Sequence, residues 1–196
     1  TLNVTNPPGL DMSPIRPVIQ KYQADLIDAL SVQEPIAFAG NAYRVTWRER
    51  DPLAGSLAGG RWAPPQLFEV LYTSLGPVAA VAEIHFHFSR QSVFPSRPVC
   101  LNTLGVKTGR TLRLADVGQL EALGVDTRTY RSLDYLRCRQ VGAAAHFLEF
   151  DGMIVPSARY AEDNLVLFLD HLAGHGELSL ESSSDLDWQE WRLAHP

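Results

Sequence analysis

The apolar segment FEVLYTSLGPVAAVAEIHFHF changes from a strand-like to a helix-like pattern at a Gly-Pro pair. Its first part, residues 68–73, predicts a short strand. Ser74 is well placed to begin a helix, and Pro77 would sit in the first turn, where a missing backbone N–H costs little. The predicted helix covers roughly residues 77–88 and is mostly apolar, with one carboxylate, Glu83, near its middle. That carboxylate either lies on a narrow exposed stripe or faces a pocket.

The other apolar segments are also short, and strand-like and helix-like patterns alternate along the 196 residues. This length suits one domain, and the predicted fold class is α+β. Strands are predicted in IAFAGNAYRVTW, with an interruption at Gly40-Asn41, and in PVCLNTL, RTLRL, FDGMIVPSAR and NLVLFLDHL. Helices are predicted at residues 14–31, opened by Ser13-Pro14, and at 119–123 and 132–147, the last with a small-residue stretch at 142–145. The final stretch ESSSDLDWQEWRLAHP is polar with two tryptophans, which predicts a loosely attached end or a partner contact.

The charge of the chain disfavours several classes of function. A formal net charge of −5 argues against sequence-independent nucleic-acid binding. A local group of arginines on this acidic chain suits a small anionic ligand better, and it consists of Arg44, Arg48, Arg50 and Arg61. No apolar run reaches the roughly 18 residues of a membrane span, and no signal peptide is visible. Cys100 and Cys138 form no metal-type pair, so a reducing cytoplasm is the simplest expectation, with one disulfide left open.

Four residues are candidates for chemistry, and each also has an ordinary structural role. Arg61 follows a glycine pair and could clamp a phosphate with two hydrogen bonds, or form a surface salt bridge. Tyr72 could stack on a flat ligand or belong to the core. Glu83 could stabilise positive charge if it is partly desolvated, or it could be solvated. Ser157 follows a strand and a proline, where a turn or cap role is the default.

The sequence shows no standard motif for metal, phosphate or hydrolase chemistry. His85 and His87 would diverge by about 200° on a helix, and no third ligand stands at a standard spacing, so no metal site is expected. Ser157 is not in a Gly-x-Ser-x-Gly elbow, which disfavours a hydrolase nucleophile. Neither a P-loop nor a Gly-x-Gly-x-x-Gly pattern is present.

Taken together, the candidates form an ordered pattern, GGRWAPP…LYTS…VAAVAE…IVPS, which resembles the RES domain family. Further likenesses are AYRVTW, RCRQVGAAAHF and the segment Asn164-LVLF, so the resemblance covers about residues 40–172. Ala63 departs from it, because family members commonly have Asn after the Arg-Trp pair. The resulting division is an N-terminal helical extension at 1–35, a RES domain at 36–175 and a C-terminal tail at 176–196.

The resemblance implies an ADP-ribosyltransferase-like core of short strands with flanking helices. It also implies a cytoplasmic toxin of a toxin–antitoxin pair that consumes NAD⁺ and is covered at its active site by an Xre-type antitoxin. The residues carried over are Arg61, Tyr72, Glu83 and Ser157 as the active-site set, with Arg44 as a further NAD⁺-binding candidate.

The residue types of this set suit cleavage of the nicotinamide–ribose bond. Glu83 would stabilise an oxocarbenium-like sugar, and Arg61, with Arg44, would clamp the pyrophosphate. Tyr72 would attract the flat cationic nicotinamide ring, and Ser157 could bind the ribose or the amide. No metal, nucleic acid or membrane is implied. Water, phosphate and a protein target all remain possible acceptors, and the alternative is a non-catalytic binding or interaction module on the same scaffold.

Overall fold

The computed structural model describes residues 22–92, 97–174, 176–187 and 191. Its strands are β1 (Ile36–Trp47), β2 (Val70–Ser74), β3 (Val99–Arg113), β4 (Gly152–Pro156), β5 (Asp163–Phe168) and β6 (Glu177–Asp185). Its helices are α1 (Ala24–Ser31), α2 (Pro77–Ser89), α3 (Val117–Ala122), the 3₁₀ turn η1 (Thr127–Thr129), α4 (Leu136–Phe147) and α5 (Leu169–Leu172). The predicted α+β class is confirmed.

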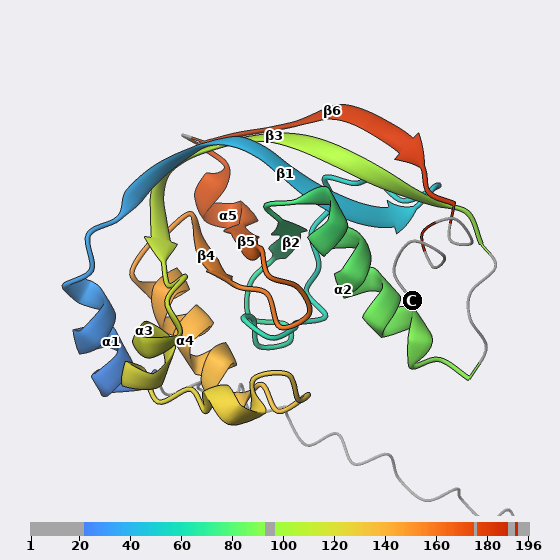
Figure 1. The fold of residues 1–196 in the computed structure, drawn as a ribbon. Helices are drawn as coiled ribbons and strands as arrows, with labels where there is room; N and C mark the ends of the chain where they lie inside the picture. Colours follow the sequence, from blue (N-terminus) through green and yellow to red (C-terminus); the bar gives the residue numbers. More distant parts are fainter. Residues whose placement is uncertain (1–21, 93–96, 175, 188–190, 192–196) are drawn as a thin grey trace, which may run out of the picture.

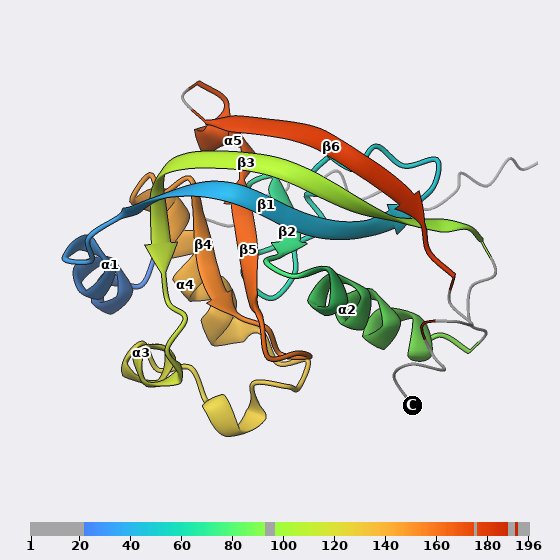
Figure 2. The ribbon, with the colours of Figure 1, turned by 45° about the horizontal axis from the view of Figure 1, so that its top comes forward.

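The strands form one sheet in the order β1-β2-β5-β4-β3-β6, and an additional β1–β3 pairing closes the first five into a ring. Strands β1, β3 and β6 run as a long curved layer, and β4 and β5 cross beneath them (Figures 1 and 2). The junction of β1 with β2 is a single pair, Tyr43 opposite Ser74, and Ser74 lies opposite Asn164 of β5. The ring therefore places the end of β2 beside both β1 and β5.

Helices cover the ring on two sides. Helices α1, α3 and α4 gather near β4, and α2 lies on the other side, below β1 (Figure 1). Leu26 and Leu30 of α1 are fully buried in the cluster shared with α4, β4 and β5. The α2 face buries Ala80, Val81 and Phe88 against β1 and β3. These contacts hold α2 against the part of the ring where β2 ends.

The junction between β2 and α2 follows the prediction closely, with one correction. Helix α2 begins at Pro77 and ends one residue beyond the predicted range. Ser74 is not its cap, however, because Gly76 is the N-cap residue and makes no side-chain cap. Ser74 instead ends β2, and its hydroxyl donates to Asn164 Oδ1 at 2.8 Å.

Four other local predictions are wrong. The segment NLVLFLDHL is not one strand, because β5 ends at Phe168 and Leu169–Leu172 form helix α5. Gly40-Asn41 does not interrupt β1, because that strand pairs with β3 on both sides of the glycine. The two strands predicted at residues 98–104 and 110–114 are one continuous strand, β3. Residues 181–185, predicted to begin a loosely attached end or a partner contact, belong to β6, which pairs with β3.

The terminal predictions are tested only in part. The helix predicted for residues 14–31 is α1 from Ala24. Residues 14–21 lie outside the described residues, and Tyr22 and Gln23 are described but not helical. In the tail, Trp191 is described and packs near His85, with ring centroids 4.9 Å apart. The boundaries proposed after residues 35 and 175 stay predictions.

Candidate active site

A cavity of about 360 Å³ opens between β1, the end of β2, α2 and the glycine pair before Arg61. This volume lies within the range of small-molecule sites in proteins. Four of the five residues singled out from the sequence line it: Arg44, Arg61, Tyr72 and Glu83. The fifth, Ser157, reaches the cavity through Glu83. The fold therefore brings together residues that are up to 113 positions apart.

Glu83 points from α2 toward the β4–β5 hairpin, where two donors hold one of its oxygens. Oε1 accepts a hydrogen bond from Ser157 Oγ at 2.6 Å and one from Asn164 Nδ2 at 3.0 Å. These bonds leave Oε2 for a ligand in the cavity that Glu83 lines. The solvated alternative for this residue is thus wrong, because the side chain is half-buried and fixed in direction.

Ser157 occupies the first position of the turn between β4 and β5. Its Oγ accepts the backbone N–H groups of Arg159 at 3.0 Å and Tyr160 at 3.2 Å while donating to Glu83. Turn chemistry thus fixes the hydroxyl, and its proton is already engaged. The geometry makes Ser157 a positioning residue for Glu83 rather than a free donor to a ligand.

Arg61 lies between two tyrosine rings. Its guanidinium carbon is 4.6 Å from the ring centroid of Tyr130 and 4.5 Å from that of Tyr135, and Nη2 donates to the Ser132 carbonyl at 3.3 Å. Nη1 is buried and has no hydrogen-bond partner among the residues that the structure describes. Burial raises the pKa of the nearby Cys138 thiol. The positive charge of Arg61 acts in the opposite direction and offsets this rise only in part. Because Arg61 also lines the cavity, its positive charge favours an anionic ligand there.

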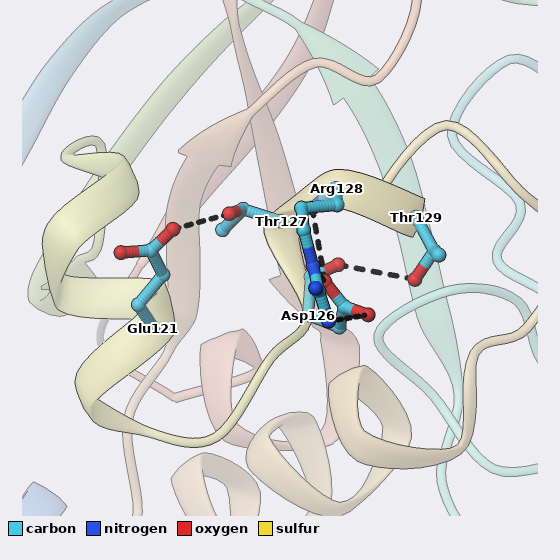
Figure 3. Close-up of polar contacts among 5 residues, drawn as sticks. All are labelled: Glu121, Asp126, Thr127, Arg128 and Thr129. Atoms are coloured by element: carbon cyan, nitrogen blue, oxygen red, sulfur yellow. Dashed lines mark hydrogen bonds and ion pairs between the residues drawn. The ribbon is translucent and has the colours of Figure 1, made fainter.

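The turn before Tyr130 is fixed by its own polar contacts (Figure 3). Asp126 accepts the backbone N–H of Arg128 at 3.1 Å, and its carboxylate also pairs with the Arg128 side chain. Thr127 donates to Glu121 of α3, which ties η1 to that helix. The aromatic wall against Arg61 therefore rests on an ordered turn.

Tyr72 supports the backbone that carries Arg61. Its hydroxyl accepts the Trp62 N–H at 3.0 Å, and a Cβ placed on Gly60 would lie 2.5 Å from the Tyr72 hydroxyl oxygen. Burial raises the pKa of Tyr72 well above its ordinary value, so the phenol is neutral at neutral pH. Arg139 of α4 adds a bond from Nε to the Gly60 carbonyl at 2.8 Å. Gly60 is needed here because the tyrosine approaches its backbone directly, and Gly59 is needed because its φ of +77° favours glycine.

Arg44 holds the loop that borders the cavity. Its Nη1 donates to the carbonyls of Pro52 and Ala54, both at 2.8 Å. Burial lowers the pKa of Arg44 to about 10, and the guanidinium still carries its charge at neutral pH. Arg48, from the same sequence cluster, instead pairs with Asp185 of β6 at 2.5 Å. The arginines that are close in sequence therefore lie in two places: Arg44 lines the cavity, and Arg48 pairs with the edge strand β6.

Three functional residues were missed by sequence reasoning. Asn164 orients Glu83, and its position after the Pro-Ser turn was the available signal. Arg159 lines the cavity, with its guanidinium over the Phe86 ring, and burial lowers the pKa of Arg159. His87 also lines it, and burial lowers the pKa of His87 despite the Glu83 charge. No sequence signal marked Arg159 or His87 as cavity residues.

Electrostatically, the cavity combines guanidinium groups with one carboxylate. Arg44, Arg61 and Arg159 all line it, and Glu83 supplies the negative charge. Such a site can bind a doubly charged phosphate compound through the arginines. It can also stabilise a positive charge that develops on a neighbouring atom of the same ligand.

Comparisons with known proteins agree with this geometry. A model of the RES domain matches residues 41–189. Curated relatives are the NAD(+) phosphorylase MbcT of Mycobacterium tuberculosis and that of Mycobacterium bovis, each 29% identical over 168 residues, which cover 82% of this chain and 90% of the relative. The crystal structure of the M. tuberculosis MbcT–MbcA toxin–antitoxin complex matches with a TM-score of 0.79 and 27% identity, over 88% of this chain and 98% of the solved chain.

Proposed function

The chain belongs to the RES domain family, and on this premise we propose that it is an NAD⁺-consuming toxin that cleaves the nicotinamide–ribose bond. One observation carries the proposal. Glu83 is held by Ser157 and Asn164 at Oε1, inside a cavity that arginines also line. A fixed carboxylate near cationic phosphate-binding groups suits a substrate that is anionic at its pyrophosphate and becomes cationic at its ribose.

Each residue then has a distinct role. Arg61 and Arg44 bind the pyrophosphate, because both residues line the cavity and a guanidinium group can give a phosphate two parallel hydrogen bonds. Glu83 stabilises the oxocarbenium-like ribose through Oε2, and the ring of Tyr72 contacts the nicotinamide. Ser157 and Asn164 act on Glu83 rather than on the substrate, because both donate to it.

We propose phosphate as the acceptor. Support comes from the similarity to the relative named NAD(+) phosphorylase, which extends over 82% of this chain. In this reaction a phosphate oxygen forms a bond to the ribose C1 as the glycosidic bond breaks. The bonding electron pair leaves with the nicotinamide nitrogen, so the products are neutral nicotinamide and ADP-ribose 1-phosphate. Water and a protein side chain are the competing acceptors.

The proposed partner is an antitoxin that covers the cavity. Support comes from the likeness to MbcT in its complex with MbcA. An antitoxin of the Xre type and a cytoplasmic location belong to the same proposal, as does the lack of direct nucleic-acid or membrane binding. Among the described residues, no helix is long and apolar enough to cross a membrane.

We propose that the reaction needs no metal. The reactive groups of the cavity are a carboxylate and guanidinium groups, and these suffice to stabilise charge of both signs. Among the described residues, the three-ligand group that could hold an ion is His146, Asp170 and His171, and none of these lines the cavity.

The first test follows nicotinamide release from NAD⁺ by the purified chain, with and without phosphate and with a cell lysate. Phosphate-dependent release supports the phosphorylase, and release without phosphate means a glycohydrolase. Release only with lysate, together with a labelled protein band, means transfer to a protein target. Glu83→Gln is the matched control, because it keeps the size of the side chain and removes its charge.

The alternative is a non-catalytic binding or interaction module, and expression in bacteria distinguishes it. Growth arrest that Glu83→Gln abolishes supports the toxin. Harmless expression of the wild-type chain, with no nicotinamide released under any condition, supports the binding module.

A further inference from the structure

Two imidazoles and a carboxylate meet where the end of α4 faces α5, and we call His146, Asp170 and His171 the α4–α5 cluster. One nitrogen from each histidine and one oxygen from the aspartate all lie within 4.8 Å of one another. His146 Nε2 is 2.7 Å from Asp170 Oδ2, and the two imidazole rings stack with centroids 4.1 Å apart. The cluster combines the side chains that most often bind zinc and related ions.

The surroundings of both histidines orient them. His171 Nδ1 donates to the Phe150 carbonyl at 2.8 Å, which leaves the lone pair on Nε2. Metal-binding histidines almost always donate their other ring nitrogen to a carbonyl or carboxylate in this way. The opposite neighbour of His146 is Phe68, whose ring stacks on the imidazole with centroids 4.1 Å apart and planes 6° apart. His146 is thus held between two flat rings. Because the lone pairs of ring nitrogens lie in the ring planes, His171 must turn out of the stack for both histidines to bind the same ion.

We propose that the α4–α5 cluster binds one Zn²⁺ ion through His146, Asp170 and His171. Bonds of about 2.0–2.1 Å in a tetrahedral site place ligand atoms roughly 3.3 Å apart. The 2.7 Å pair must open slightly and the widest pair must close by about 1.5 Å, as side-chain rotations allow. Asp170 is about half exposed, with 48% of its side-chain surface accessible, so an ion can enter from solvent and keep a water as its fourth ligand.

The site is separate from the proposed catalytic cavity. Asn164, which orients Glu83, stands near the first residue of β5, whereas α5 begins directly after the last residue of that strand. A bound ion would join the end of α4 to α5. It would therefore stabilise the fold without contacting the residues that line the cavity, and the proposal does not depend on NAD⁺ cleavage.

The test is titration of Zn²⁺ into the metal-free, untagged full chain, followed by calorimetry and thermal unfolding, with Co²⁺ absorption as a reporter of geometry. We expect saturable binding of one ion per chain, a rise in the unfolding temperature and the visible bands of tetrahedral Co²⁺. Asp170→Asn and His171→Asn should each weaken Zn²⁺ affinity by at least about tenfold. His171→Asn keeps an N–H that can reach the Phe150 carbonyl, so its loss of affinity would not reflect loss of that bond.

His87→Asn is the matched control, because it removes a histidine outside the cluster and should leave Zn²⁺ affinity unchanged. Asp170→Asn tests the site without removing buried structure, and circular dichroism verifies its fold. Absence of saturable Zn²⁺ binding by the wild-type chain would overturn the proposal. Equal Zn²⁺ affinities for the wild-type chain and both cluster variants would also overturn it.

Discussion

Replacing Gly142 with alanine should destabilise the protein and misplace Arg61 at the same time. A Cβ on Gly142 would lie 1.7 Å from the Trp62 carbonyl oxygen, whereas ordinary contact begins at 3.4 Å. To restore ordinary contact, either the Trp62 carbonyl or helix α4 must move by about 1.7 Å. Such overpacking costs about 3 kcal/mol, and the helix propensity of alanine offsets about 1 kcal/mol. We therefore expect a loss of about 2 kcal/mol in the free energy of unfolding.

The same displacement should impair catalysis, because Trp62 follows Arg61 directly in the chain. A misplacement of about 1 Å can cost roughly 100-fold in rate, so we expect kcat/KM for NAD⁺ to fall by about that factor. Urea unfolding measures the stability, and nicotinamide release measures the activity. Activity is compared at a temperature where the variant is fully folded.

Gly118→Ala is the matched control for this substitution. Gly118 is also helical but exposed, and its added Cβ would approach only the carboxylate of Asp116, at 3.2 Å, which caps α3 by accepting the Gly118 N–H. This variant should be as stable as the wild type or slightly more stable, with unchanged activity. If Gly142→Ala behaved like Gly118→Ala in both assays, the tight contact between α4 and Trp62 would not position Arg61, and our reasoning would be refuted.

Three further predictions follow from the contacts of the site and core. Ser157→Ala should lower kcat about 10- to 100-fold with little change in KM, because it loosens Glu83 but not the arginines; a changed KM alone would contradict this role. Tyr72→Phe should cost about 1 kcal/mol in urea unfolding, since the Trp62 N–H loses its acceptor, and unaltered stability would show that water replaces the bond. Asp151→Ala should cost about 3 kcal/mol in the same assay, because this fully buried carboxylate accepts two backbone N–H groups at 2.8 Å, and a cost below about 1 kcal/mol would contradict that estimate.

Local patterns predicted the fold where the local signal and the tertiary pairing agree. The β2–α2 junction was predicted to within one or two residues at each end, because apolar periodicity and Pro77 point the same way. Gly40-Asn41 was misread because a turn signal weighs little against a strand that pairs with β3 over almost its whole length. Strand β6 was missed because most of its residues are exposed, so an apolar face is absent from its sequence.

The site was predictable where residues resemble a family pattern and not where the fold alone brings side chains together. Arg44, Arg61, Tyr72 and Glu83 were chosen from short motifs in order, and they share one cavity. Arg159 was not predicted, because its place in the cavity wall depends on contact with Phe86, 73 residues away in the sequence. Propensity and spacing carry no information on such pairs.

The contacts of the site also determine how a partner could inhibit it. The segment that carries Arg61 is held by Tyr72, by Arg139 and by the close approach of Gly142, and Glu83 is held by two donors. Deforming either group would break several buried contacts, each worth about 1 kcal/mol or more. Covering the cavity mouth breaks none of them. We therefore expect an antitoxin to inhibit by blocking entry of NAD⁺, so that the bound toxin keeps its site geometry and regains full activity when the antitoxin dissociates.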